Sequence, residues 1–122
     1  MFVMAACMSV AHSAEPQSQT VIGSKVADFT LDNCYGKSVS LSDFSDRKLV
    51  VIAFLGTECP LAKLYGPRLG QLQAEFSDQG VTVIGVNSNT QDSITELSAY
   101  AHRHKIRYPL LKDVGNRVAD AM

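Results

Sequence analysis

Two uninterrupted apolar runs constrain the fold of this chain more than any other feature. Residues 48–54 read KLVVIAF and residues 81–87 read VTVIGVN; both have the length and the β-branched content of strands buried on both faces of a sheet. Apolar residues recur at near-helical spacing over residues 60–78, which predicts an amphipathic helix between the runs. This order predicts two parallel strands joined by a right-handed crossover, with 48–54 as the first central strand. The apolar residues of the helix are Leu61, Leu64, Leu69, Leu72 and Phe76.

The flanking segments complete an α/β pattern. Residues 26–31 and the later run KSVSL lie on either side of a turn at residues 33–36, which predicts a small hairpin. After the second strand, residues 88–106 form a helical pattern, followed by the short extended run RYPLLKD and the start of another helix in GNRVADAM. The expected fold class is therefore α/β, with an N-terminal hairpin and a β-α-β-α core. The inward stripe of the second long helix comprises Ile94, Leu97 and Ala101.

Composition excludes several function classes. The chain has 122 residues, a formal net charge of -1 and no basic face or run of like charge, so it does not fit a nucleic-acid-binding protein. It contains no nucleotide-binding or haem-attachment motif, and we predict neither a cofactor nor a metal site. His102 and His104 are expected on a solvated helix face, and Tyr65 and Tyr100 at the edge of the core with solvated hydroxyls.

The N-terminal segment differs in character from the rest. Residues 1–14 are apolar and small, lack any Asp, Glu, Lys or Arg, and predict a signal peptide cleaved near Ala11 or Ala14. Residues 15–22 then form a polar linker, and residues 23–122 form the domain. The apolar segment is shorter than the roughly 20 residues that cross a bilayer, so no membrane span is expected. These features predict export to the periplasm or beyond the cell.

Cys59 stands where a strand ends and a helix begins at Pro60, a comfortable first helical position for proline. A thiol reacts as its thiolate, which the unpaired N–H groups and the dipole of a helix N-terminus favour. Lys63, one turn later, adds positive potential, whereas Glu58 opposes it. The position predicts a redox-active cysteine; the other interpretation is a buried structural thiol.

Five segments, KVADFTL, GKSVSLSDF, LVVIAFLGTECP, GVTVIGVN and YPLLKD, occur in this order. Together they resemble the redoxin group of thioredoxin-like proteins, which contains alkyl hydroperoxide reductases, thiol-specific antioxidants and periplasmic thiol-disulfide proteins. Pro67 stands eight residues after Cys59, where thioredoxin-like proteins carry a helix-kinking proline. The resemblance covers residues 21–122 and implies a thioredoxin-like fold. It also implies that Thr57 forms a hydrogen bond with the reactive sulfur, as a threonine does in peroxiredoxins.

The chain departs from the family pattern at defined positions. Ala62 occupies the place of the second cysteine of a C-x-x-C pair, and Thr57 precedes Cys59 by two residues rather than three. Redoxin domains continue beyond the point where this sequence stops, so the domain is expected to be incomplete at its C-terminus, with one exposed sheet edge.

The resemblance implies a thiol-dependent oxidoreductase in which Cys59 attacks a peroxide or a disulfide. An external thiol or a thioredoxin-like protein would restore it. Cys34 as a resolving partner in a disulfide with Cys59 is a lesser alternative, which the spacing does not decide. The competing function is a non-catalytic binding module of a larger exported electron-transfer protein.

Overall fold

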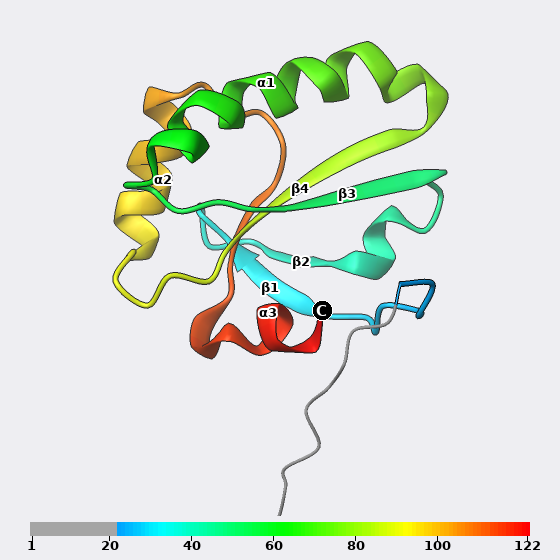
Figure 1. Ribbon diagram of the computed structural model, residues 1–122, viewed down its shortest axis with the longest axis horizontal. Helices are drawn as coiled ribbons and strands as arrows, with labels where there is room; N and C mark the ends of the chain where they lie inside the picture. The colour runs from blue at the N-terminus through cyan, green and yellow to red at the C-terminus, as the bar shows by residue number, and fades with distance from the viewer. Residues whose placement is uncertain (1–21) are drawn as a thin grey trace, which may run out of the picture.

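The computed structural model describes residues 22–122, in which five strands form one sheet in the order β2-β1-β5-β4-β3 (Figure 1). The predicted signal peptide and all but the last residue of the linker lie outside the described residues. None of the helices within 22–122 has both the length and the apolar character needed to cross a bilayer. The strands are β1 (Thr30–Asn33), β2 (Ser38–Ser40), β3 (Leu49–Phe54), β4 (Val81–Asn87) and β5 (Leu110–Lys112); the helices are α1 (Pro60–Phe76), α2 (Ile94–Arg103) and α3 (Arg117–Ala121), with short 3-10 helices η1 (Leu41–Phe44), η2 (Ser77–Gln79) and η3 (Val114–Asn116).

The strand pairing confirms the predicted α/β order. β3 and β4 are parallel, in a register that runs from Leu49 opposite Val81 to Phe54 opposite Val86, and β5 continues the parallel set beyond β4. β1 and β2 form the expected antiparallel hairpin, although β1 begins at Thr30 rather than at residue 26. β1 also pairs antiparallel with β5, which joins the hairpin to the core.

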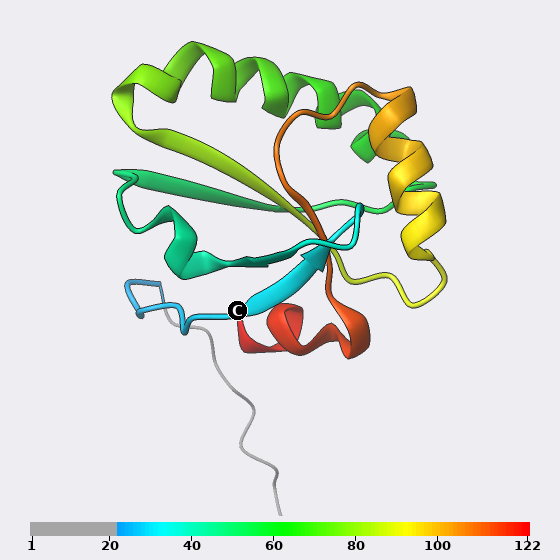
Figure 2. The same ribbon diagram turned by 180° about the vertical axis from the view of Figure 1, so that it is seen from behind.

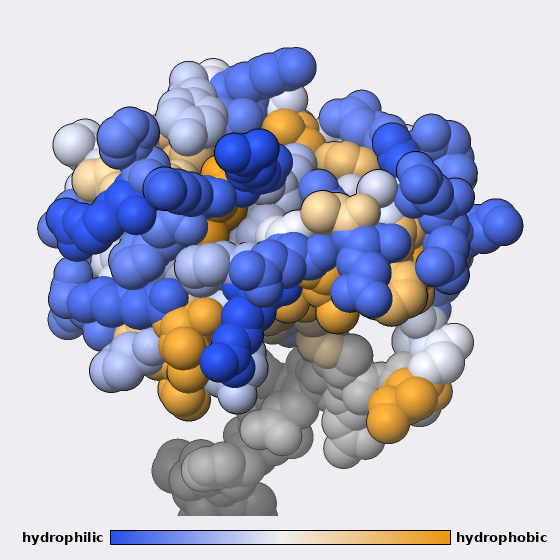
Figure 3. Space-filling view, turned by 90° about the horizontal axis from the view of Figure 1, so that it is seen from above, coloured by the Kyte–Doolittle hydropathy of each residue, from blue (hydrophilic) through white to orange (hydrophobic). Residues whose placement is uncertain are grey.

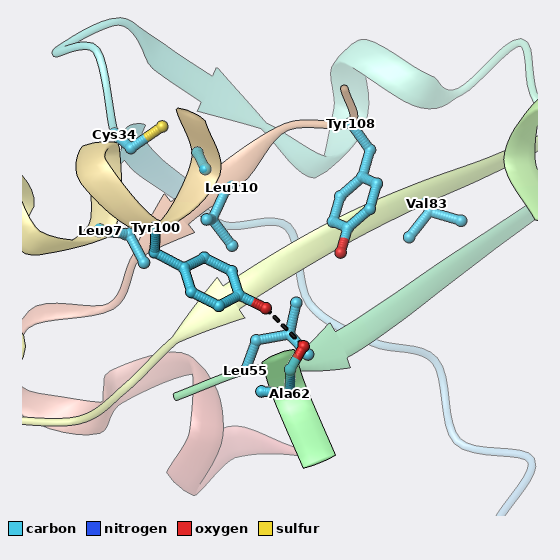
Figure 4. Close-up of a cluster of buried hydrophobic side chains, with 9 residues drawn as sticks. Cys34, Leu55, Ala62, Val83, Leu97, Tyr100, Tyr108 and Leu110 are labelled. Carbon is cyan, nitrogen blue, oxygen red and sulfur yellow. Dashed lines mark hydrogen bonds between the residues drawn. The ribbon is translucent and has the colours of Figure 1, made fainter. Parts of the chain in front are cut away.

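Two layers of helix cover the sheet. α1 and α2 lie on one face, whereas η1 and α3 lie on the other (Figures 1 and 2). β4 serves both faces because alternate strand residues point to opposite sides: Val83 packs under α1 and α2, while Ile84 and Val86 pack against the α3 side. Figure 4 shows part of the first core, where Tyr100, Leu97 and other buried side chains converge from both helices and the sheet.

The prediction that residues 48–54 form a central strand buried on both faces is wrong. Within the described residues, β3 is the edge strand of the sheet, and its side chains are half-buried or exposed. β4 is the interior strand of the pair, lying between β3 and β5, and six of its seven residues are buried. The two apolar runs look alike in the sequence because neighbouring strands, not local composition, determine which strand becomes central.

The predicted inward stripe of α1 is also wrong for most of its members. Leu61, Leu64 and Leu72 are exposed, and 63% of the Leu61 surface is open to solvent. Figure 3, a view of the molecule from above, shows apolar patches among hydrophilic residues. Small residues face the core instead: Ala62 and Gly66 are buried. A Cβ atom added to Gly66 would approach the Tyr100 hydroxyl to 2.5 Å, so close approach of α2 selects this face of the helix.

On α2, Leu97 and Ala101 are buried as predicted, but Ile94 is 43% exposed. Tyr100 takes its place in the core, at 3% exposure, and donates its hydroxyl to the Ala62 carbonyl over 2.6 Å. The expectation of a solvated Tyr100 hydroxyl is therefore wrong. His104 also departs from prediction, since its half-buried ring packs against Tyr100, with ring centroids 4.7 Å apart.

Candidate active site around Cys59

Cys59 is the N-cap residue of α1 and its side chain is exposed. Its backbone is extended, its N–H donates to the Gly56 carbonyl over 3.3 Å, and its carbonyl accepts the N–H of Lys63 over 3.0 Å. Pro60 follows at the first helical position, where its missing N–H costs nothing. The thiol therefore lies at the positive end of a 17-residue helix and is open to a reactant.

Two charged residues predicted around the thiol pair with each other. The Lys63 ammonium donates to the Glu58 carboxylate over 3.1 Å, and the Glu58 side chain is largely in solvent. The positive charge of Lys63, expected to favour the thiolate, and the negative charge of Glu58, expected to oppose it, therefore form one exposed ion pair. Such a pair contributes little free energy, because water and salt screen it.

Thr57 is buried and forms its hydrogen bonds with Asp92 rather than with the sulfur of Cys59. Its backbone N–H donates to Asp92 Oδ2 over 3.0 Å, and its hydroxyl donates to Asp92 Oδ1 over 2.7 Å. The expected bond between the hydroxyl and the sulfur is not among those of the described residues. Thr57 instead ties the loop that precedes Cys59 to the loop that follows β4.

Asp92 is the centre of a buried polar network that the sequence analysis missed. Its Oδ2 also accepts the side-chain amides of Asn87, over 2.6 Å, and Asn89, over 3.2 Å. The Asn87 amide also donates to the Leu55 carbonyl over 2.9 Å. Lys112 completes the network, because its ammonium donates to Asn87 Oδ1 over 2.8 Å and to the Asn89 carbonyl.

The hydrogen bonds decide the charge state of Asp92. Burial alone would raise the pKa of this carboxyl group, but donation from the Thr57 N–H, the Asn87 amide, the Thr57 hydroxyl and the Asn89 amide outweighs burial and lowers the pKa to about 2. Asp92 is therefore ionised at neutral pH. The Asn87 side chain joins Asp92 to Lys112: its amide nitrogen donates to the Asp92 carboxylate, and its amide oxygen accepts a hydrogen bond from the Lys112 ammonium.

The topology explains why these residues meet. β3, β4 and β5 are parallel, so their carboxyl ends share one edge of the sheet. Cys59 and Thr57 follow β3, Asp92 follows β4, and Lys112 ends β5. Loops at the carboxyl ends of parallel strands are the usual place for functional residues in α/β folds. Within residues 22–122, no group of three or more metal-ligating side chains comes together.

Cys34 lies apart from this site. It is buried, its N–H donates to the Leu110 carbonyl over 2.9 Å, and both it and Cys59 are free thiols. Burial raises the pKa of the Cys34 thiol despite an opposing hydrogen bond with Tyr35. In Figure 4, Cys34 and Ala62, which lies in the first turn of α1, are on opposite sides of Tyr100. Cys34 is therefore a buried core residue, packed in the cluster that includes Tyr100 and Leu110.

The AhpC/TSA family model matches residues 22–122, the whole of the described part of the chain. The chain belongs to the AhpC/TSA family. Among curated relatives, it is 30% identical over 99 residues to the thiol-disulfide oxidoreductase ResA of Halalkalibacterium halodurans, covering 81% of this chain and 54% of ResA. It is 32% identical over 96 residues to the chloroplastic peroxiredoxin Q of Suaeda salsa, covering 79% of this chain and 44% of that protein. The chain thus spans about half the length of these relatives.

Solved structures confirm the thioredoxin-like fold. The peroxidoxin BcpB of Mycobacterium tuberculosis superimposes with a TM-score of 0.71 at 25% identity, over 80% of this chain and 62% of BcpB. A thiol:disulfide interchange protein of the thioredoxin family from Chlorobium tepidum gives a TM-score of 0.66 at 20% identity, over 76% of this chain and 62% of that one. The redoxin resemblance drawn from the sequence is therefore confirmed.

Proposed function

We propose that this protein is a thiol-dependent oxidoreductase with one reactive cysteine, Cys59, which acts on a peroxide or a disulfide. The observation that carries the proposal is an exposed thiol at the N-cap of α1 in a chain of the AhpC/TSA family. Peroxiredoxin Q and ResA, by their names, represent the two substrate classes. Thr57, Pro60, Lys63 and Glu58 are supporting residues, which shape the loop and the charge around the sulfur.

With a peroxide, the Cys59 thiolate attacks one peroxide oxygen. An S–O bond forms as the O–O bond breaks, the sulfur is oxidised to a sulfenic acid, and the leaving oxygen takes a proton and departs as water or an alcohol. A first external thiol then displaces water from the sulfenic acid and forms a mixed disulfide. A second external thiol releases Cys59 and leaves as a disulfide.

With a disulfide substrate, the same thiolate attacks one sulfur atom, and the other leaves as a thiolate. The mixed disulfide is again resolved by an external thiol. This one-cysteine cycle follows from Ala62, which occupies the place of a second active-site cysteine and is buried under Tyr100. The partner is therefore a small thiol or a thioredoxin-like protein.

The test is to trap the sulfenic acid. The full chain is treated with dilute hydrogen peroxide and a dimedone-type probe, and labelled peptides are assigned by mass spectrometry because Cys7 and Cys34 are also thiols. We expect the probe on the Cys59 peptide, no label there in Cys59→Ser, and full labelling in the matched control Cys34→Ala. Equal total labelling in wild type and Cys59→Ser would overturn the proposal.

We further propose that the protein is exported, on the composition of residues 1–14. Intact-mass measurement of the protein from its native host tests this. Export predicts a mature N-terminus just after Ala11 or Ala14, whereas a chain that retains residues 1–14 contradicts the predicted cleavage.

A further inference from the structure

Asp92 connects two loops that are far apart in the sequence, the loop before α1 and the loop before α2. Its exposed fraction is 7%, and its two carboxylate oxygens accept four hydrogen bonds. Two of the four come from Thr57, which stands two residues before Cys59. One carboxylate thus holds both the backbone and the side chain of the residue that leads into the candidate active site.

We propose that Asp92 is a positioning residue for Cys59, which holds the Gly56–Cys59 turn in its reactive geometry through Thr57. The proposal rests on the proposed function, since it assigns a role to Asp92 in the reaction of that thiol. Asp92 does not contact the sulfur, and its effect passes through the loop.

An ordinary structural role for Asp92, capping of α2, is already filled by another residue. Ser93 is the N-cap of α2: its hydroxyl accepts the Glu96 N–H over 3.2 Å, and the Glu96 carboxylate accepts the Ser93 N–H over 2.7 Å. Asp92 directs none of its hydrogen bonds to the backbone of α2. The backbone N–H that Asp92 accepts belongs instead to Thr57, in the loop before Cys59. This contact distinguishes Asp92 from a helix-capping residue.

The turn before Cys59 is held at several points. The Cys59 N–H donates to the Gly56 carbonyl, and Thr57 lies between them, bound to Asp92. The amide of Asn89, itself bound to Asp92, packs against Gly56. A Cβ atom added at Gly56 would lie 2.7 Å from Asn89 Nδ2 and 3.7 Å from Cys59 Cβ, so the network extends to the immediate surroundings of the cysteine.

The charge of Asp92 makes these bonds strong and directional. Hydrogen bonds to an ionised acceptor are shorter and stronger than neutral ones, and a buried carboxylate is costly unless donors surround it. The side-chain amides of Asn87 and Asn89 donate the other two hydrogen bonds, and Lys112, bound to the Asn87 amide oxygen, provides the counter-charge. Replacing the carboxylate by an amide leaves Thr57 with one acceptor oxygen for two donors, which frees the loop.

The experiment compares four variants of the full chain by two readouts, the rate of Cys59 oxidation by hydrogen peroxide and the rate of its alkylation by iodoacetamide. Asp92→Asn and Thr57→Val remove the anchor, Thr57→Ser retains the hydroxyl, and Asp113→Asn is the matched control. Asp113 is also a buried carboxylate, but it accepts the N–H groups of Val118 and Ala119 in α3 and not those of the Cys59 loop. Rates are compared at a temperature where circular dichroism shows each variant to be folded.

We expect both rates to fall about 10-fold or more in Asp92→Asn and Thr57→Val, because misplacing a reacting group by about 1 Å can lower a rate by about 100-fold. Thr57→Ser and Asp113→Asn should remain within about 3-fold of wild type, a margin far below that positioning effect. Equal rates in all variants would overturn the proposal, as would an equal loss in Asp113→Asn, which would indicate general loosening. If Asp92→Asn does not fold, the test depends on Thr57→Val alone. Oxidation and alkylation rates equal to those of wild type in that variant would overturn the positioning role of Asp92.

The two readouts separate this proposal from the proposed function. If peroxide forms no sulfenic acid at Cys59 but alkylation still slows in Asp92→Asn and Thr57→Val, the positioning role is supported and the peroxide reaction is refuted. If peroxide oxidises Cys59 equally fast in every variant, the proposed function stands and the positioning role is refuted.

Discussion

Protonation of Asp92 should cost the protein a defined part of its stability in acid. The hydrogen bonds of the network lower the pKa of this carboxyl group from its ordinary 3.8 to about 2. Each pKa unit corresponds to about 1.4 kcal/mol, so the ionised carboxylate contributes about 2 kcal/mol to the free energy of unfolding. Because the folded pKa is the lower one, this contribution is complete above about pH 4 and is lost as pH falls through about 2.

The variant Asp92→Asn isolates this contribution because it cannot titrate. Urea unfolding of wild type and Asp92→Asn is followed by circular dichroism at several pH values between 7 and 2. The wild type should be the more stable at pH 7, and its advantage should shrink by about 2 kcal/mol between pH 5 and pH 2. With a slope of about 1 to 2 kcal/mol per molar urea, the difference in midpoint narrows by roughly 1 to 2 M.

The comparison cancels the other carboxyl groups, because both proteins carry them. Glu96 is the neighbour to consider: bonds from Ser93 lower its pKa, and the charge of Asp92 opposes that shift. Asp92→Asn removes that opposing charge, so the Glu96 trend differs between the two proteins, and carrying Glu96→Gln in both removes this contribution from the comparison. A stability difference that stays constant from pH 7 to pH 2 would show that the network does not hold Asp92 in its ionised form, and the reasoning about the loop anchor would lose its electrostatic basis.

Two further substitutions test the packing of the elements that support the site. Gly85→Ala on β4 should lose about 1 to 3 kcal/mol of unfolding free energy, because its Cβ would lie 2.6 Å from Leu110 Cδ1. In Gly70→Ala, by contrast, the added Cβ would contact only the Tyr108 ring, at 3.9 Å, so the substitution should stabilise α1 by up to about 1 kcal/mol. Urea unfolding measures both variants, and equal changes in unfolding free energy would contradict the packing described around Gly85 and Gly70. Ser93→Ala removes the N-cap of α2 and should lose about 1 kcal/mol in the same assay, whereas Thr95→Ala, an exposed change inside the helix, should stay within about 0.5 kcal/mol. A neutral Ser93→Ala would mean that the cap contributes nothing.

Local periodicity predicted the existence and order of the elements but not their place in the sheet. The two apolar runs that became β3 and β4 have the same character, yet β3 lies at an edge of the sheet and β4 lies in its interior, between β3 and β5. That difference depends on β5, which pairs with β4 from a distant part of the chain. The inward face of α1 was missed for a related reason. Ala62 and Gly66 face the core because Tyr100 approaches them closely, whereas the spacing of large apolar residues in the sequence indicated the leucines.

The candidate site was predictable where it is local in sequence. Cys59, Pro60 and the spacing to Pro67 could be read directly, because they belong to one strand–helix junction. Asp92 could not, since it meets Thr57 across 35 residues and only the strand register brings them together. A usable signal was the polar residue that ends two of the three parallel strands: Asn87 closes β4 and Lys112 closes β5, whereas β3 ends at Phe54.

The arrangement of thiols and anchors bears on where the reductant comes from. A resolving cysteine within the chain must reach the reactive sulfur, since a disulfide requires Cα atoms within about 7 Å. Cys34 is buried in the core on the far side of Tyr100 from the first turn of α1, so bridging it to Cys59 would require the core to open. The Asp92 network opposes such a movement because it fastens the loop before Cys59 to the carboxyl ends of β4 and β5. Within residues 22–122, Cys59 is an exposed thiol and Cys34 a buried one, so under the proposed function the mixed disulfide or sulfenic acid at Cys59 should be resolved by a thiol other than Cys34.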